Sequence, residues 1–303
     1  MKIILGFLLF LIINKYKGQE YLQYYRIIND AEISSLDRNF EKADILYQKA
    51  FQLVKKPFKE DYLFAAINSE RLNEDEKTFR YLSIGIQNGL TLSRITPKLS
   101  SFKKSVYWKV LKNRYMSLHE KHLQTLNITL RKEIEEMIKN DQKVRNPIFG
   151  TNKKMKIIDL QNFQKLKEII RLNDNKWPGF SMIGEISPKG KYDVTDNIVL
   201  ISLHFDREQT EQLQSYMLEA VLNGEMYPYQ YARVIDYTIG NNLSKVAENF
   251  VKNKNYIETC FLYGTYLNAN ICDCKNAEAE RVKIGFEPLK DYYRKVKSGY
   301  KCL

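Results

Sequence analysis

Apolar residues near the start of the chain recur at helical spacing, in two runs separated by the polar turn 37–41. Positions i, i+3, i+4 and i+7 lie on one face of an α-helix. We therefore predict two amphipathic helices that pack through this face. The first run contains Tyr24, Ile27, Ile28 and Ala31, and the second contains Ala43, Leu46, Tyr47, Ala50, Phe51 and Val54.

Small and aromatic residues in this region have an order that resembles a tetratricopeptide repeat. The order is Ala31, Phe40, Ala43, Tyr47, Ala50 and then Pro57. A weaker second copy places Thr78, Leu82 and Gly85 35 residues after Ala43, Tyr47 and Ala50. Because about three repeats are needed for an independent solenoid, we expect support from the helix after Pro97. That helix carries Trp108, Leu111, Tyr115 and Leu118.

Helical patterns continue through the rest of the chain. The apolar run 198–205 fits a buried strand or a buried helix. We favour a helix, because Asp206 and Gln209 form a capping-box signature for a helix that Asn223 and Gly224 would close. Other predicted apolar faces are Leu130, Ile134, Met137 and Ile138, then Leu160, Phe163, Leu166 and Ile170, and, after Pro228, Ala232, Ile235 and Ile239.

These patterns predict an all-α fold. We expect a signal peptide at residues 1–18, tetratricopeptide-like helical hairpins at 19–126 and an irregular helical domain at 127–303. The loop from Trp177 to Glu185 interrupts the helices, because Pro178 fixes its own φ and Gly179 and Gly184 allow backbone conformations closed to other residues.

The N-terminus predicts export. The apolar run Ile3–Ile13 has eleven residues, well short of the roughly 20 that a membrane-spanning helix needs. It is typical of a signal-peptide h-region, with Gly18 as the small residue before cleavage. No small residue stands two positions earlier, so a retained anchor is the alternative. We expect a periplasmic, extracellular or cell-envelope protein.

The formal net charge of +12 makes an acidic surface of the envelope a candidate partner. Basic residues are scattered among glutamates, and no block of five or six like charges marks a nucleic-acid-binding arm. We therefore expect no nucleic-acid partner. A solvated surface is the simpler explanation of the charge.

Four cysteines fall in the last 44 residues, at Cys260, Cys272, Cys274 and Cys302. An even number in an exported chain is typical of disulfides. One residue separates Cys272 from Cys274, so a bridge between them would be strained. We expect one of these two to pair with Cys260 and the other with Cys302. The spacing is too short for a zinc knuckle, and no histidine lies nearby.

Candidate chemistry centres on the third histidine. His119 and His122 are three residues apart, whereas a zinc-protease helix needs four, so we interpret both as surface or hydrogen-bonded residues. We expect no metal and no cofactor. His204 and Asp206 share a side only on a strand, so on a helix we expect Asp206 to be an N-cap. Asp141 and Arg145 are neighbours on a helix.

Several short motifs together resemble a bacterial family known only as a domain of unknown function. Its members share a D-Q-x-x-R helix, a W-P loop, an H-A-D motif, a D-R pair and a Y-G-T-Q motif. The matching positions are Asp141-Gln142-x-x-Arg145, Trp177-Pro178, His204-x-Asp206, Asp236 and Tyr263-Gly264-Thr265, with Gly184, Gly224-Glu225, Arg281-x-x-x-Gly285, Pro288-Leu289 and Tyr292 in order. The similarity covers about residues 129–293.

The chain departs from that family at three positions. The family's D-R, Y-G-T-Q and H-A-D have Tyr237, Tyr266 and Phe205 in place of the Arg, the Gln and the Ala. If the family's polar residues form an active site, these changes indicate an altered or disabled one. If they form a structural network, the changes are drift.

Our leading functional hypothesis is an exported ligand- or protein-binding module, with a protein, a peptide or a small molecule as its ligand. Candidate binding residues are Gln142, Trp177, Tyr263, Thr265 and Arg281. The competing hypothesis is a hydrolase with His204 as base and Asp206, Asp141, Arg145 or Asp236 as further catalytic candidates. A structural envelope protein is a third. If the protein is an enzyme, these side chains should line one cleft.

Overall fold

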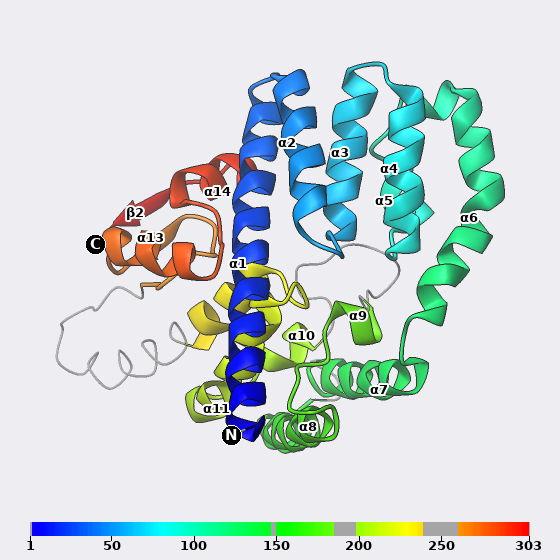
Figure 1. Ribbon diagram of the computed structural model, residues 1–303. Coiled ribbons are helices and arrows are strands. Elements are labelled where there is room, and N and C mark those ends of the chain that lie inside the picture. Colours follow the sequence, from blue (N-terminus) through cyan, green and yellow to red (C-terminus); the bar gives the residue numbers. More distant parts are fainter. Residues whose placement is uncertain (1, 147–149, 185–197, 239–259, 303) are drawn as a thin grey trace. The chain divides into compact units, whose positions relative to one another are not determined.

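The computed structural model describes residues 2–146, 150–184, 198–238 and 260–302, with side chains from Gly18 onward (Figure 1). The expectation of an all-α fold is confirmed, since helices dominate the described residues. In this part of the chain the strands are β1 (Ala269–Ile271) and β2 (Tyr300–Cys302), which pair in parallel with Ala269 opposite Tyr300. The sequence analysis did not predict this small sheet.

The chain divides into two compact units. The first contains the residues up to Ile128 together with Leu222–Gly224, and the second begins at Thr129. The first unit consists of α1 (Lys2–Leu36), α2 (Phe40–Leu53), α3 (Lys59–Arg71), α4 (Asp75–Gln87), α5 (Leu92–Ile95), the 3-10 helix η1 (Phe102–Lys104) and α6 (Val106–Gln124).

Neighbouring helices of the first unit pack in chain order, α1 on α2, α2 on α3, α3 on α4 and α4 on α6 (Figure 1). The predicted apolar faces are buried. Tyr24, Ala31, Ala43, Tyr47 and Ala50 each expose at most 1% of their surface. Burying these side chains supplies the main driving force for pairing the helices.

One turn recurs 35 residues apart in the first unit. Arg38 and Asn73 both have positive φ, at 62° and 59°. The next residue in each turn donates its amide N–H to the carbonyl five positions back, Asn39 to Ser34 and Glu74 to Ser69. This pairing closes a helix and reverses the chain. The 35-residue sequence period is therefore matched by a repeated turn.

Helix α1 runs without a break through position 18, the predicted end of the signal peptide. A search of the described helices finds none with the length and apolar character needed to span a bilayer.

The second unit contains α7 (Ile128–Val144), α8 (Asn152–Leu172), α9 (Phe180–Ile183), α10 (Val199–Ser202), α11 (Arg207–Leu222), the helical residues 228–238, α13 (Cys274–Lys283) and α14 (Leu289–Val296). The apolar run 198–205 forms α10 and the turn after it, so the helical interpretation is confirmed. Ile239 and Glu185 of the predicted elements lie outside the described residues.

All four cysteines are paired, Cys260 with Cys272 and Cys274 with Cys302. The Cα atoms are 5.0 Å and 5.6 Å apart, within the range that a bridge requires. The expectation that the two central cysteines bond outward is confirmed. Two pairs at disulfide distance point to an oxidising environment outside the cytosol.

Candidate functional site

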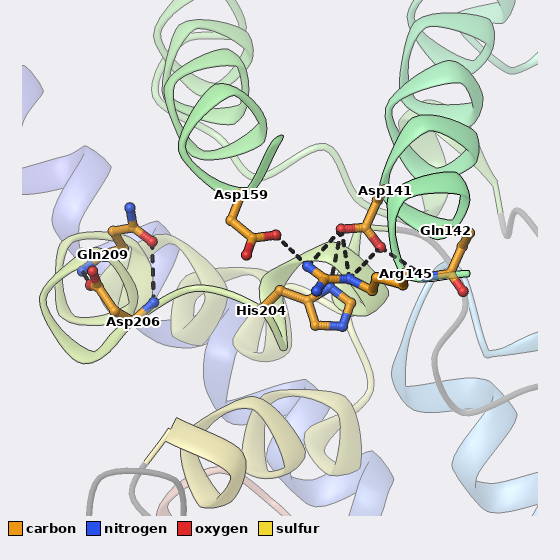
Figure 2. Close-up of polar contacts among 7 residues, drawn as sticks. All are labelled: Asp141, Gln142, Arg145, Asp159, His204, Asp206 and Gln209. Atoms are coloured by element: carbon orange, nitrogen blue, oxygen red, sulfur yellow. Dashed lines mark hydrogen bonds and ion pairs between the residues drawn. The ribbon is translucent and has the colours of Figure 1, made fainter. Parts of the chain in front are cut away.

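A cluster of charged side chains joins α7, α8 and the turn after α10 (Figure 2). Arg145 donates from Nη2 to Oδ1 of Asp141 at 3.0 Å and to Oδ1 of Asp159. His204 places Nδ1 3.1 Å from the same Oδ1 of Asp141. Gln142, which is exposed, donates from Nε2 to Oδ2 of Asp141 at 2.8 Å. The structure thus brings four of the predicted residues together and adds Asp159.

Asp141 is the centre of this cluster, and its side chain has no exposed surface. Burial would raise the pKa of Asp141, but hydrogen bonds from His204 and Arg145 outweigh burial, so its pKa lies below the usual value. The carboxylate therefore stays ionised with both of its oxygens hydrogen-bonded.

His204 is held by its neighbours in the chain as well as by Asp141. Leu203 and Phe205 on either side are buried, and the ring of Phe205 packs edge-on against Phe163 with centroids 5.6 Å apart. The His204 side chain keeps 18% of its surface exposed. No hydrogen bond from the described residues reaches Nε2, so this nitrogen is available to a ligand.

The sequence analysis did not identify Asp159 as a site residue. The prediction assigned Leu160 to the buried face of α8, but Leu160 is 51% exposed and that assignment is wrong. Steps of four, three and four residues place Asp159, not Leu160, in line with Phe163, Leu166 and Ile170. An acid on an apolar face was the available signal. Burial raises the pKa of Asp159, and Arg145 offsets part of this effect.

Asp206 lies outside the cluster, as Figure 2 shows. Its Oδ1 accepts from the amide N–H of Gln209 at 2.9 Å, and Oε1 of Gln209 accepts from the amide of Asp206 at 3.1 Å. This is the predicted capping box at the start of α11. The side chain therefore serves the helix start, and its role as a catalytic candidate is withdrawn.

Asp236 belongs to a second network, which holds the loop Tyr263–Thr265. Its fully buried carboxylate accepts from the amides of Tyr263 at 2.7 Å and Thr265 at 2.8 Å, and from the Thr265 hydroxyl at 2.9 Å. Burial raises the pKa of Asp236, and these hydrogen bonds offset only part of the effect.

Other buried side chains satisfy the carbonyl groups of the same loop. Arg281 donates to the carbonyl of Tyr263, and Tyr293 and Tyr292 donate to those of Gly264 and Thr265 at 2.9 Å and 2.8 Å. Arg281 lies over the Phe286 ring with its Cζ 3.7 Å from the centroid, and burial lowers the pKa of its guanidinium. Apart from Nη2 of Arg281, which has no partner among the described residues, these polar groups hold the loop, which is the pattern of a structural network.

The loop at Trp177 is anchored by Glu225. The amide of Phe180 donates to the Glu225 carbonyl at 3.2 Å, and the amide of Ser181 donates to its carboxylate at 2.7 Å. A Cβ atom on Gly179 would lie 2.5 Å from the Glu225 carbonyl oxygen, so the close approach requires glycine. Trp177, two positions before Gly179 in the chain, is buried and is part of the core rather than the surface.

The candidate residues thus form two groups of contacts rather than one cleft. His204, Asp141, Arg145 and Gln142 form the first group with Asp159, and Asp236, Tyr263, Thr265 and Arg281 form the second. Among the described residues no hydrogen bond or ion pair joins the two. Of these groups, the one at His204 has a titratable side chain with an available nitrogen.

Asp141, Asp159 and His204 also offer ligand atoms that lie within 4.8 Å of one another, close enough to hold a metal ion. The guanidinium of Arg145 already contacts both carboxylates. A metal ion would supply the positive charge that the guanidinium of Arg145 already supplies to the two carboxylates. A metal would therefore have to displace Arg145. The residues as arranged fit an ion-paired cluster better than a metal centre.

The departures at Tyr237 and Tyr266 fall near each other, since the two side chains are close enough to interact electrostatically. Burial raises the pKa of Tyr266 to about 12, so the hydroxyl stays neutral at physiological pH. The guanidinium of Arg233 lies over its ring, 4.2 Å from the centroid.

Comparison with known proteins gives no match to a family model, a curated protein or a solved structure.

Proposed function

We propose that the chain is an exported hydrolase in which His204 acts as the general base. The observation that carries the proposal is the contact between Nδ1 of His204 and the buried carboxylate of Asp141, at 3.1 Å. A carboxylate on Nδ1 fixes the proton there and leaves Nε2 as the acceptor.

The expected chemistry is attack of water on an ester or phosphoester. Nε2 takes a proton from the attacking water, and the imidazolium that forms is stabilised by the ionised Asp141. The same proton then passes to the leaving group, so the cycle returns His204 to its neutral form. Arg145 keeps the two carboxylates together, and Asp141 stays aimed at His204 through these contacts.

The test is hydrolysis of a panel of p-nitrophenyl esters and p-nitrophenyl phosphate. We expect His204→Gln to lower the rate by roughly a hundredfold or more, the usual contribution of a general base. His119→Gln is the matched control, because His119 lies on α6 in the first unit. Equal rates for the wild type and His204→Gln across the panel would contradict the proposal.

Ligand binding without turnover is the second candidate. It is favoured by the completeness of the cluster, in which Arg145 and Gln142 occupy both oxygens of Asp141. In this case a ligand would bind at His204 and remain unchanged. Mass spectrometry of a ligand recovered after incubation distinguishes the two, because hydrolysis alters its mass.

The proposal extends to compartment and architecture. The two cysteine pairs at disulfide distance and the apolar N-terminus support export to the periplasm, the envelope or the exterior. The 35-residue recurrence supports a tetratricopeptide-like first unit that binds a protein or peptide partner. The motif order supports membership of the domain-of-unknown-function family.

A further inference from the structure

Arg233 is a half-buried cation without a carboxylate partner among the described residues. Other half-buried arginines are paired in this chain. Arg94 binds Glu60, and Arg131 binds Glu135, each at 3.0 Å, with side chains 23% and 21% exposed. Arg145 binds two acids. Arg281 is fully buried and also has no ion pair among the described residues, but its Nε and Nη1 donate to carbonyl groups. Removing a cation from water without a counter-charge is costly, so the weak contacts of Arg233 call for a physical reason.

The hydrogen-bonding capacity of Arg233 is also largely unused. Its Nη1 reaches Tyr229 Oη and the Thr265 carbonyl, both at 3.4 Å, which is the long limit of a hydrogen bond. Its Nε is buried and has no partner among the described residues. A guanidinium carries five N–H donors in a planar fork. The buried Nε is closed to a ligand, but Nη2 is not buried and has no partner among the described residues, so the outer edge of the guanidinium is left for another molecule.

Aromatic rings fix the orientation of this guanidinium. It lies over the ring of Tyr266, which stacks on Phe261 with centroids 4.5 Å apart and planes 20° apart. A contact with an aromatic ring uses the face of the guanidinium and leaves the N–H groups in its plane able to donate hydrogen bonds. Tyr229, one helical turn earlier, stacks on Tyr292 and adds a hydroxyl next to the fork.

We propose that Arg233, with Tyr229 and Tyr266 beside it, binds the oxyanion group of a small ligand, a carboxylate or a phosphate. Arginine recognises both groups through two parallel N–H···O bonds, and a site walled by aromatic rings strengthens them by excluding water. The proposal does not rest on hydrolysis at His204, because it concerns the second network of the unit.

The experiment titrates wild-type protein with sodium phosphate and, separately, sodium acetate, with sodium chloride holding the ionic strength constant. We expect one of the two anions to raise the melting temperature along a saturating curve, because a ligand of the native state stabilises it. The anion that acts at the lower concentration identifies the ligand class. A linear rise equal to that of chloride in both arms would overturn the proposal.

Variants locate the site. Arg233→Gln should abolish the saturating response, and Arg233→Lys should weaken it, because lysine keeps the charge but not the fork. Arg207→Gln is the matched control, an arginine of the same unit that is 70% exposed and should leave the response unchanged. An unaltered response in Arg233→Gln would show that the anion binds elsewhere.

A second measurement needs no variant to fold. Phenylglyoxal labels accessible arginines of the wild-type protein, and peptide mapping gives the extent at each position. We expect the active anion to protect Arg233 and to leave Arg207 labelled as before. Equal labelling of Arg233 with and without the anion would count against the site.

Discussion

Oδ1 of Asp141 accepts hydrogen bonds from both Nδ1 of His204 and Nη2 of Arg145, at 3.1 Å and 3.0 Å. One carboxylate oxygen thus links a group that can transfer protons to a permanent cation. The arrangement separates two roles, because Arg145 keeps Asp141 ionised in a buried place while Nε2 of His204 has no hydrogen bond from the described residues. The predictions for stability and for activity therefore concern different members of the cluster.

Asp141→Asn should impair hydrolysis more than folding. Asparagine has the size of aspartate, but it cannot stabilise an imidazolium, and its NH₂ group can favour the wrong tautomer of His204. We expect a rate lower by roughly a hundredfold or more, measured with the substrate on which the wild type is most active. A full rate in Asp141→Asn, with the native circular dichroism spectrum, would refute the orienting role.

Arg145→Ala should destabilise the protein by about 3 kcal/mol, because it leaves the buried carboxylate of Asp141 without its cation. Urea unfolding followed by circular dichroism measures this. Arg207→Ala is the control, since Arg207 also bonds an acid four positions away in the chain, Glu211, but is 70% exposed. Its effect should stay below about 1 kcal/mol. Equal midpoints for the two variants would show that burial at Asp141 does not matter.

The stability of the second unit should depend on acid through Asp141. Its pKa is lowered on folding, so its contribution is present above the unfolded pKa of about 3.9 and is lost as the pH falls through the folded value. Unfolding free energies measured from pH 6 down to pH 3 should fall more steeply for the wild type than for Asp141→Asn. Parallel curves would contradict a lowered pKa.

The loop Tyr263–Thr265 should depend on Asp236. Asparagine at this position can accept fewer of the N–H and O–H donors that now converge on the carboxylate, and a buried donor without a partner costs about 1–3 kcal/mol. Hydrogen exchange should show faster exchange at the amides of Tyr263 and Thr265 in Asp236→Asn. Protection equal to that of the wild type would show that other contacts hold the loop.

Local signals in the sequence predicted much of this structure. Asp206 and Gln209 form the expected capping box because both partners lie within one turn. The buried stripe of α1 and α2 follows from helical period alone. Asp141 and Arg145 are four residues apart, and their ion pair follows from that spacing.

Such local signals could not predict contacts between segments that are distant in the sequence. Asp159 meets Arg145 across two helices, and His204 meets Asp141 across 63 positions, so spacing could not reveal either partner. The parallel pairing of Ala269 with Tyr300 was missed because three-residue strands carry no usable alternation. Tyr263, Thr265 and Arg281 were expected to bind a ligand, but a polar residue that serves a buried backbone has the same appearance in a sequence.

The disulfides give the last prediction. The bridges close loops with sequence separations of 12 and 28, and in the chain-entropy model each stabilises the fold by about 3 to 4 kcal/mol. Cys302 ends β2, which pairs with β1 directly before Cys272, so both bridges fix the same small sheet. Reduction should therefore loosen the segment 260–302 before the α1–α4 helices, which contain no cysteine. Hydrogen exchange with and without reductant measures this order, and equal loosening of both regions would show that the bridges stabilise the chain as a whole rather than this segment.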